Sequence, residues 1–89
     1  MKLTKYKLQK GFVVQRYPKK LVLFDSETST MYTLNDTAAF VFKKMKEGLK
    51  KEEIAKQLYN RYNISEKKAQ NDVESTIQKL LTIKIFKQA

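Results

Sequence analysis

The spacing of apolar residues changes once along the chain, and this change constrains the fold more than any other feature. Up to residue 34 the apolar residues form three short runs separated by turn-forming residues, which is typical of β-strands. From residue 35 they recur every three or four residues, which is typical of helices with one buried face. The pattern therefore predicts three strands followed by three helices.

The three strands are expected to form an antiparallel meander. The runs cover residues 12–17, 21–24 and 28–34, and Pro18 ends the first of them. The connections are short, so consecutive runs pair with each other and the third run lies at an edge. Alternation in the third run places every second side chain on the same face. One set is Thr30, Tyr32 and Leu34, and the other is Ser29, Met31 and Thr33.

The helical half contains three segments with recognisable ends. Asn35 or Asp36 can cap the first helix, which ends near Gly48. The second runs from about residue 51 to residue 62, and the third begins after Ser65. The second and third are joined tightly, in helix-turn-helix fashion. The fold class is therefore α+β, winged helix-turn-helix-like, with a three-stranded antiparallel sheet followed by three helices.

The length and the charge distribution set the domain organisation. With 89 residues the chain holds one domain, which we place at residues 11–89, after a basic and extended segment at residues 1–10. Of the net charge of +10, residues 1–20 contribute seven basic and no acidic residues. Such a segment could bind nucleic acid or attract an acidic peptide, and it could also be a solvated tail without function.

The composition excludes most catalytic chemistry. Because the chain has no Cys and no His, thiol nucleophiles, His general bases and zinc sites of the usual kind are ruled out. Two glycines cannot form a phosphate-binding loop. We therefore assign no catalytic residue, no metal site and no cofactor, and we expect a binding protein instead of an enzyme. No apolar stretch approaches the roughly 20 residues of a membrane helix, so a cytoplasmic protein is expected.

An ordered set of residues resembles the PqqD family over roughly residues 8–86. The upstream part is Lys10-Gly11-Phe12 and Leu23-Phe24-Asp25. The central part is the run Leu34-Asn35-Asp36-Thr37-Ala38-Ala39, then Val41-Phe42 and Gly48. The remainder is Glu52-Glu53-Ile54-Ala55, Leu58, Tyr62, Ala69, Asp72-Val73, Leu80 and Ile85-Phe86.

This resemblance implies a function in peptide natural-product biosynthesis. PqqD-like proteins are recognition elements for ribosomally made, post-translationally modified peptides (RiPP recognition elements). They bind the leader of a precursor peptide and present its core to a modifying enzyme, such as a radical-SAM enzyme, a cyclodehydratase or a leader peptidase. The leader adds as a strand beside the third strand, in the groove against the third helix.

The residue pattern is compatible with this mechanism. Residues 28–34 contain no Lys, Glu or Pro, which commonly protect edge strands from pairing. In the third helix the stripe Ala69, Val73, Ile77 and Leu80 is expected in the core, and the positions beside it are the better groove candidates. The predicted peptide-binding residues are Thr28, Ser29, Thr30, Met31, Tyr32, Thr33, Asp72, Thr76, Lys79 and Ile83.

Other interpretations remain open at this point. The third run could instead be covered by the third helix or lie centrally, and Asp72 could simply pair with Lys68 or Lys79. A winged helix-turn-helix regulator would place the third helix in the major groove of DNA. Against this, that helix carries nearly balanced charges and no Arg, so no specific nucleic acid is expected. A dimerisation module built from the sheet edge is a further possibility.

Overall fold

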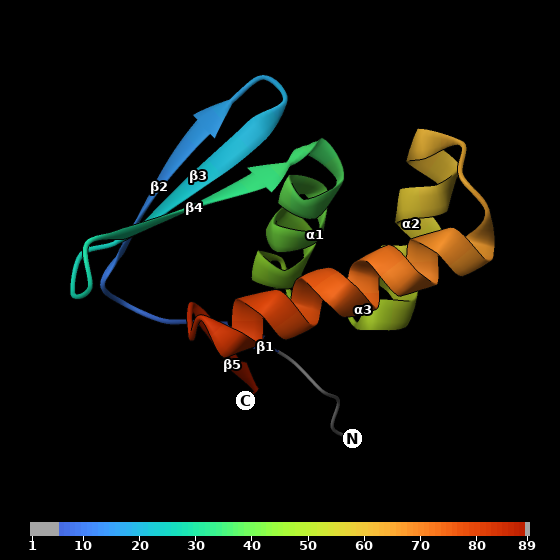
Figure 1. Cartoon of the computed structure of the whole chain (residues 1–89). Coiled ribbons are helices and arrows are strands. Elements are labelled where there is room, and N and C mark those ends of the chain that lie inside the picture. The colour runs from blue at the N-terminus through green and yellow to red at the C-terminus, as the bar shows by residue number, and fades with distance from the viewer. Residues whose placement is uncertain (1–5, 89) are drawn as a thin grey trace.

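Three strands form an antiparallel sheet in the order β2-β3-β4 (Figure 1). In the computed structural model, which describes residues 6–88, they are β2 (Phe12–Tyr17), β3 (Lys20–Asp25) and β4 (Thr30–Asn35). The meander predicted from the sequence is thus confirmed, with β3 in the centre. Lys2 and Lys5 of the basic N-terminal segment lie outside the described residues.

Three helices follow the sheet: α1 (Asp36–Lys46), α2 (Lys51–Tyr62) and α3 (Glu66–Thr82). Asn35 caps α1 by accepting a hydrogen bond from the backbone N–H of Ala38. The chain leaves α1 through Gly48, whose φ of 91° a residue with a side chain rarely adopts. In the described part of the chain, no helix is long and apolar enough to span a membrane.

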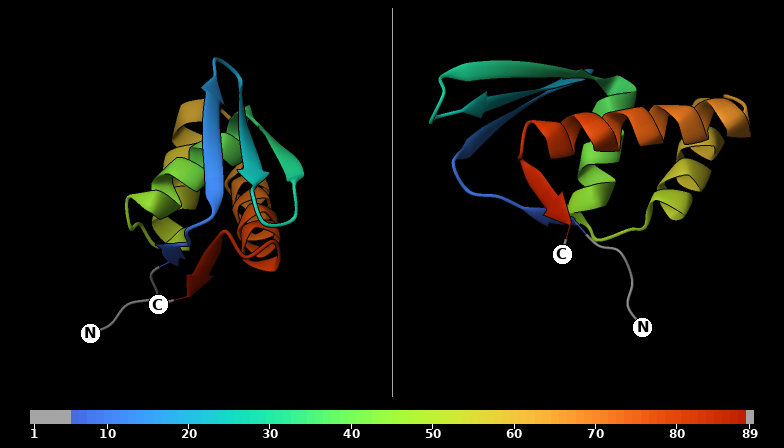
Figure 2. Two further views of the ribbon diagram at one scale, coloured as in Figure 1. Left: turned by 90° about the vertical axis from the view of Figure 1, so that its left-hand side faces the viewer. Right: turned by 60° about the horizontal axis from the view of Figure 1, so that its bottom comes forward.

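A second, two-stranded sheet joins the two ends of the described chain. It consists of β1 (Tyr6–Leu8) and β5 (Phe86–Gln88), which pair antiparallel (Figure 2). Neither strand was predicted, because each is only three residues long and carries no alternating pattern. The pairing involves residues 6–8 of the segment expected to be extended, and the domain boundary at residue 11 stays a prediction.

The core lies between one face of the sheet and the three helices. Leu21, Leu23 and Leu34 supply the sheet side and are almost fully buried. The helices contribute residues that recur at helical spacing, and all four residues of the stripe predicted for the third helix are buried, which confirms that stripe. The buried helical residues are Val41, Phe42, Met45, Ile54, Ala55, Leu58, Ala69, Val73, Ile77 and Leu80, and Ile85 and Phe86 close the core from the C-terminal end.

Two details of the sheet differ from the sequence-based expectation. Strand β4, the third strand of this sheet, begins at Thr30 and not at Thr28. Residues 26–29 form a turn in which Ser29 adopts a φ of 58°. Phe24 was expected in the core, but it pairs with Met31 on the outer face and is only half-buried. The all-apolar run at residues 21–24 shows no alternation, so its inward residues could not be chosen from the sequence.

Candidate functional site

Strand β4 is paired on one side only. Its partner is β3, in a register that sets Leu23 opposite Tyr32 and Leu21 opposite Leu34. No other strand of residues 6–88 pairs with β4. Figures 1 and 2 show that β4 is the strand of this sheet that lies nearest to α3. The predicted open edge is therefore present, and it faces a helix.

One hydrogen bond shows which backbone groups of β3 point toward β4. The N–H of Ser26 donates to the carbonyl oxygen of Gly11 at 3.0 Å, and these residues continue the register of β2 and β3. In an antiparallel pair, residues that hydrogen-bond to one neighbour alternate with residues that bond to the other. Phe24 and Val22 therefore direct their backbone groups to β2, and Leu23 directs its groups to β4.

The same alternation identifies the free backbone groups of β4. Because Tyr32 lies opposite Leu23, its N–H and C=O point inward, toward β3. Met31 and Thr33 then direct their N–H and C=O groups outward, to the open edge. The sequence could not show which set is which, since this depends on the register. A peptide strand added to β4 would pair with Met31 and Thr33.

A groove of about 590 Å³ separates the C-terminal half of β4 from α3. No Cα atom of β4 lies within 8 Å of a Cα atom of α3. Neighbouring strands lie about 4.8 Å apart, so an extended peptide paired with β4 would occupy this groove. The residues lining the groove are Lys19, Lys20, Thr33, Leu34, Asn35, Thr37, Ala38, Lys68, Asp72, Ser75, Thr76 and Lys79.

The charge of the groove is positive. Four lysines line it, and Asp72 is the only carboxylate among its lining residues. Asp72 is paired with Lys68 at 3.4 Å on the same helix. No described carboxylate lies within 4.0 Å of the Nζ atoms of the other three lysines, Lys19, Lys20 and Lys79. The uncompensated ammonium groups favour a peptide with acidic side chains.

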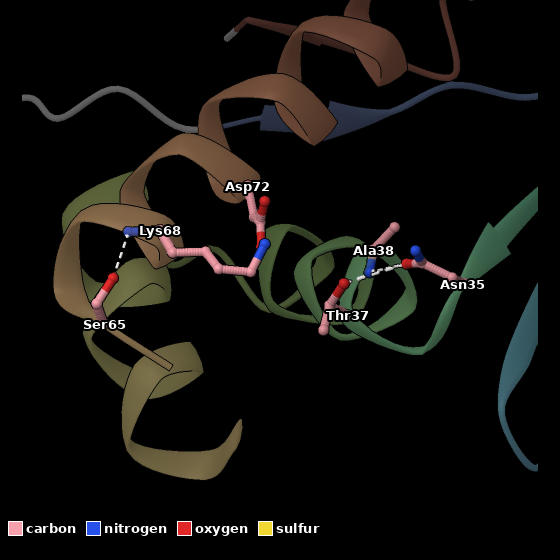
Figure 3. A network of polar contacts seen from close by, with 6 residues as sticks. All are labelled: Asn35, Thr37, Ala38, Ser65, Lys68 and Asp72. Atoms are coloured by element: carbon pink, nitrogen blue, oxygen red, sulfur yellow. Dashed lines mark hydrogen bonds and ion pairs between the residues drawn. The ribbon is translucent and has the colours of Figure 1, made fainter. Parts of the chain in front are cut away.

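Side-chain caps begin both helices that contribute residues to the groove, α1 and α3 (Figure 3). Asn35 Oδ1 accepts the backbone N–H of Ala38 at 2.9 Å and the hydroxyl of Thr37 at 3.1 Å. On the opposite wall, Ser65 Oγ accepts the backbone N–H of Lys68 at 3.1 Å. Each cap stabilises a helix by about 1 kcal/mol. Together they orient the end of β4 and the start of α3.

The structure brings four of the ten predicted site residues into this groove: Thr33, Asp72, Thr76 and Lys79. The other six lie elsewhere. Thr28 and Ser29 belong to the β3–β4 turn, and Thr30, Met31 and Tyr32 lie along β4 outside the groove lining. Ile83 follows α3 and packs against the core. Their contact with a peptide stays a prediction.

Sequence reasoning missed eight of the twelve groove residues, among them Lys68 and Ser75 of α3 and the two lysines of the β2–β3 hairpin. Lys68 and Ser75 share a helix face with Asp72 and Thr76, so helical spacing would have found them. Lys19 and Lys20 carry no such signal. They reach the groove only because the β2–β3 hairpin brings its turn beside the end of β4.

Comparisons with known proteins agree with one another. The family described as "Coenzyme PQQ synthesis protein D (PqqD)" matches residues 20–85. No curated protein matches the sequence. Two solved structures share the fold. "Lasso peptide synthetase B1 complexed with the leader peptide" aligns with a TM-score of 0.83 and 22% identity, over 93% of this chain and 98% of that one. "TbiB1 in Complex with the TbiA(beta) Leader Peptide" aligns at 0.79 and 18%, over 91% and 94%.

Proposed function

The chain belongs to the PqqD family, and on this premise we propose that it is a non-catalytic protein that binds the leader of a ribosomally synthesised precursor peptide. The open edge of β4 beside the groove of α3 is the observation that carries the proposal. Both structural neighbours are described in complex with leader peptides, which supports the same function here. The protein would act in the cytoplasm, where precursor peptides are made.

Binding proceeds by strand addition to β4. The leader accepts hydrogen bonds from the N–H groups of Met31 and Thr33 and donates to their carbonyl oxygens. Each such bond contributes roughly 0.5–1.5 kcal/mol net. Alternate side chains of the leader then point into the groove, against Asp72, Thr76 and Lys79, and these contacts supply selectivity. The remaining side chains lie on the outer face of the sheet, beside Met31.

The bound leader holds the precursor for a separate enzyme. Suitable partners are a radical-SAM enzyme, a cyclodehydratase or a leader peptidase. The protein itself supplies no thiol or imidazole for covalent chemistry. Incubated alone with the precursor, it should leave the peptide mass unchanged. It should raise the extent of modification when the enzyme is added.

DNA binding, the alternative function, is not favoured. The family and both structural neighbours support peptide binding. The charges of α3 also argue against a DNA-reading helix, because its three lysines are balanced by three acidic residues and Lys68 is paired with Asp72. A reading helix presents a clearly basic surface to the phosphates.

The direct test is a titration of the ¹⁵N-labelled protein with the leaders of candidate precursor peptides from the same genome. Amide shifts should concentrate on residues 31–35 and on the turns of α3 that carry Asp72, Thr76 and Lys79. A scrambled leader of equal composition is the control, because it keeps the charge and changes the order of side chains. Shifts confined to other surfaces, or equal affinity for the scrambled peptide, would refute the proposal.

A further inference from the structure

Both arginines of the chain line a cleft outside the groove between β4 and α3, which we call the leader groove. This cleft, of about 320 Å³, is bounded by the β2–β3 turn, α1 and the end of α2. Arg16 comes from β2 and Arg61 from the last turn of α2. Lys20, Lys43 and Lys44 complete its basic lining, and Asp36 is the single acidic residue there. We call these five cationic residues the basic cleft.

Aromatic rings contact two cationic groups of the basic cleft from α1 and α2. The Arg61 Cζ atom lies 5.7 Å from the ring centroids of both Phe40 and Tyr62. The two rings pack edge to face, with centroids 5.8 Å apart. Lys44 Nζ lies 5.4 Å from the Phe40 centroid and also pairs with Glu47 at 3.3 Å. Oriented in this way, Arg61 loses less freedom when it binds a ligand.

The positive charge of the basic cleft does not arise simply because the whole chain is basic. Among the described carboxylates, none lies within 4.0 Å of the cationic groups of Arg16, Lys43 or Arg61. By contrast, the cleft between α2 and α3 is lined by three glutamates and two lysines. Uncompensated positive charge is thus concentrated on particular surfaces, and an anionic partner would neutralise it.

The surroundings favour carboxylates over nucleotides or nucleic acid. A phosphate site commonly uses a glycine-rich loop or a free helix N-terminus. Here Asn35 caps α1, and Asp36 adds a negative charge to its first turn. Nucleobases need an open aromatic face for stacking. Phe40 and Tyr62 are half-buried, and both already lie against Arg61.

We propose that the basic cleft binds an acidic segment of the modifying enzyme, an inference that rests on the proposed leader-binding function. The planar guanidinium groups of Arg16 and Arg61 suit bidentate contact with carboxylates. Lys20 lines both the basic cleft and the leader groove. An enzyme docked on the cleft therefore lies next to the bound leader, where it can receive the precursor.

The first test uses acetyl-octaglutamate amide as a probe of the full-length protein. Amide shifts should centre on Lys43 and Arg61, and Arg61→Gln should weaken binding about three- to fivefold. The matched control is Lys56→Gln, which removes the same charge from α2 on the side facing α3. This control should leave the affinity within about 1.5-fold. Equal losses in both variants would mean diffuse charge attraction and would overturn the proposal.

Two further results with the same reagents would also overturn it. Shifts at the leader groove without shifts at Lys43 and Arg61 would show that the basic cleft is not the acidic-segment site. Tighter binding of tripolyphosphate or duplex DNA than of octaglutamate at Lys43 and Arg61 would assign the cleft to phosphates.

The second test adds a leader peptide that the protein binds and the enzyme that modifies its precursor. Arg61→Gln should raise the protein concentration needed for half-maximal modification by about threefold or more. It should leave leader affinity unchanged, since Arg61 does not line the groove. Unchanged modification would refute enzyme docking. A leader that fails to bind the wild-type protein refutes the proposed function instead, because the octaglutamate test does not use the leader.

Discussion

Two hollows of nearly equal size lie on either side of α3, and only one of them has the features of a peptide site. The leader groove, toward β4, measures about 590 Å³, and the cleft toward α2 about 600 Å³. The cleft is walled by two helices, whose backbone groups are satisfied internally. Its charges are nearly balanced, and Lys51 Nζ bridges it to Glu74 at 3.1 Å. The groove has an unpaired strand edge and unpaired lysines. The free backbone groups of β4 therefore distinguish the groove from the cleft, although the two have nearly the same volume.

Proline substitution in β4 should give the largest change in stability or leader affinity. It distinguishes residues whose backbone groups pair with β3 from residues whose groups face the open edge. Tyr32→Pro removes an inward hydrogen bond and a half-buried ring, and we expect a loss of about 2–4 kcal/mol in the free energy of unfolding. Thr33→Pro removes only an outward N–H, so it should retain the fold and lose leader affinity. Urea denaturation and leader titration measure the two quantities. If both variants unfold equally, the assignment of outward groups is wrong.

A lysine placed on either side of α3 tests which hollow binds the leader. Thr76→Lys fills the groove, and Gln70→Lys adds the same charge to the α2–α3 cleft. The first should weaken leader binding by about 1–2 kcal/mol, because its side chain occupies space that the leader needs and this loss exceeds the attraction of one more exposed charge, which is worth less than about 1 kcal/mol. The second should have little effect. Calorimetric titration of both variants checks this, and an equal loss in both would contradict the assignment of the groove.

Removing the ion pair across the α2–α3 cleft should have a smaller effect, on stability alone. Lys51 and Glu74 are both exposed, so their coupling in a double-mutant cycle should be small and should fall with added salt. The hydrogen bond from Lys51 to Glu74 raises the pKa of Lys51 above 10.5. The coupling is therefore present below that pH and is lost as the pH rises through the folded-state value. Any change in leader affinity would count against a purely structural cleft.

The smallest effect is expected at Tyr6, which links β1 to the same cleft. Partial burial raises the pKa of Tyr6 above 10.0, and the nearby Lys51 ammonium opposes this shift. Since the folded-state pKa is the higher one, the protein should lose stability as the pH rises from about 9 to about 11. Tyr6→Phe should lose slightly less over the same range. Denaturation curves at both pH values measure this difference. A steeper loss of stability in the variant would mean that folding lowers the pKa of Tyr6 instead of raising it.

A residue of the site could be predicted from the sequence only where its near neighbours in the chain indicate its position. The absence of edge protectors in residues 28–34 identified the open strand, and helical spacing identified Asp72, Thr76 and Lys79 beside the core stripe. Lys19 and Lys20 could not be found, since nothing near them in the sequence indicates a groove. The basic cleft could not be found either, because its five cationic residues come from four separate elements.

The sequence by itself determined the order of strands and helices, the buried stripes and the unprotected edge. Each of these follows from a local period or from the residue types in one segment, which act over a few neighbouring positions. The tertiary structure alone decided the register of β4, and with it the outward direction of the Met31 and Thr33 backbone groups. It also decided that Lys20 faces both the leader groove and the basic cleft. These features arise from packing between residues far apart in the chain, because a strand can shift its register without any change in its own sequence.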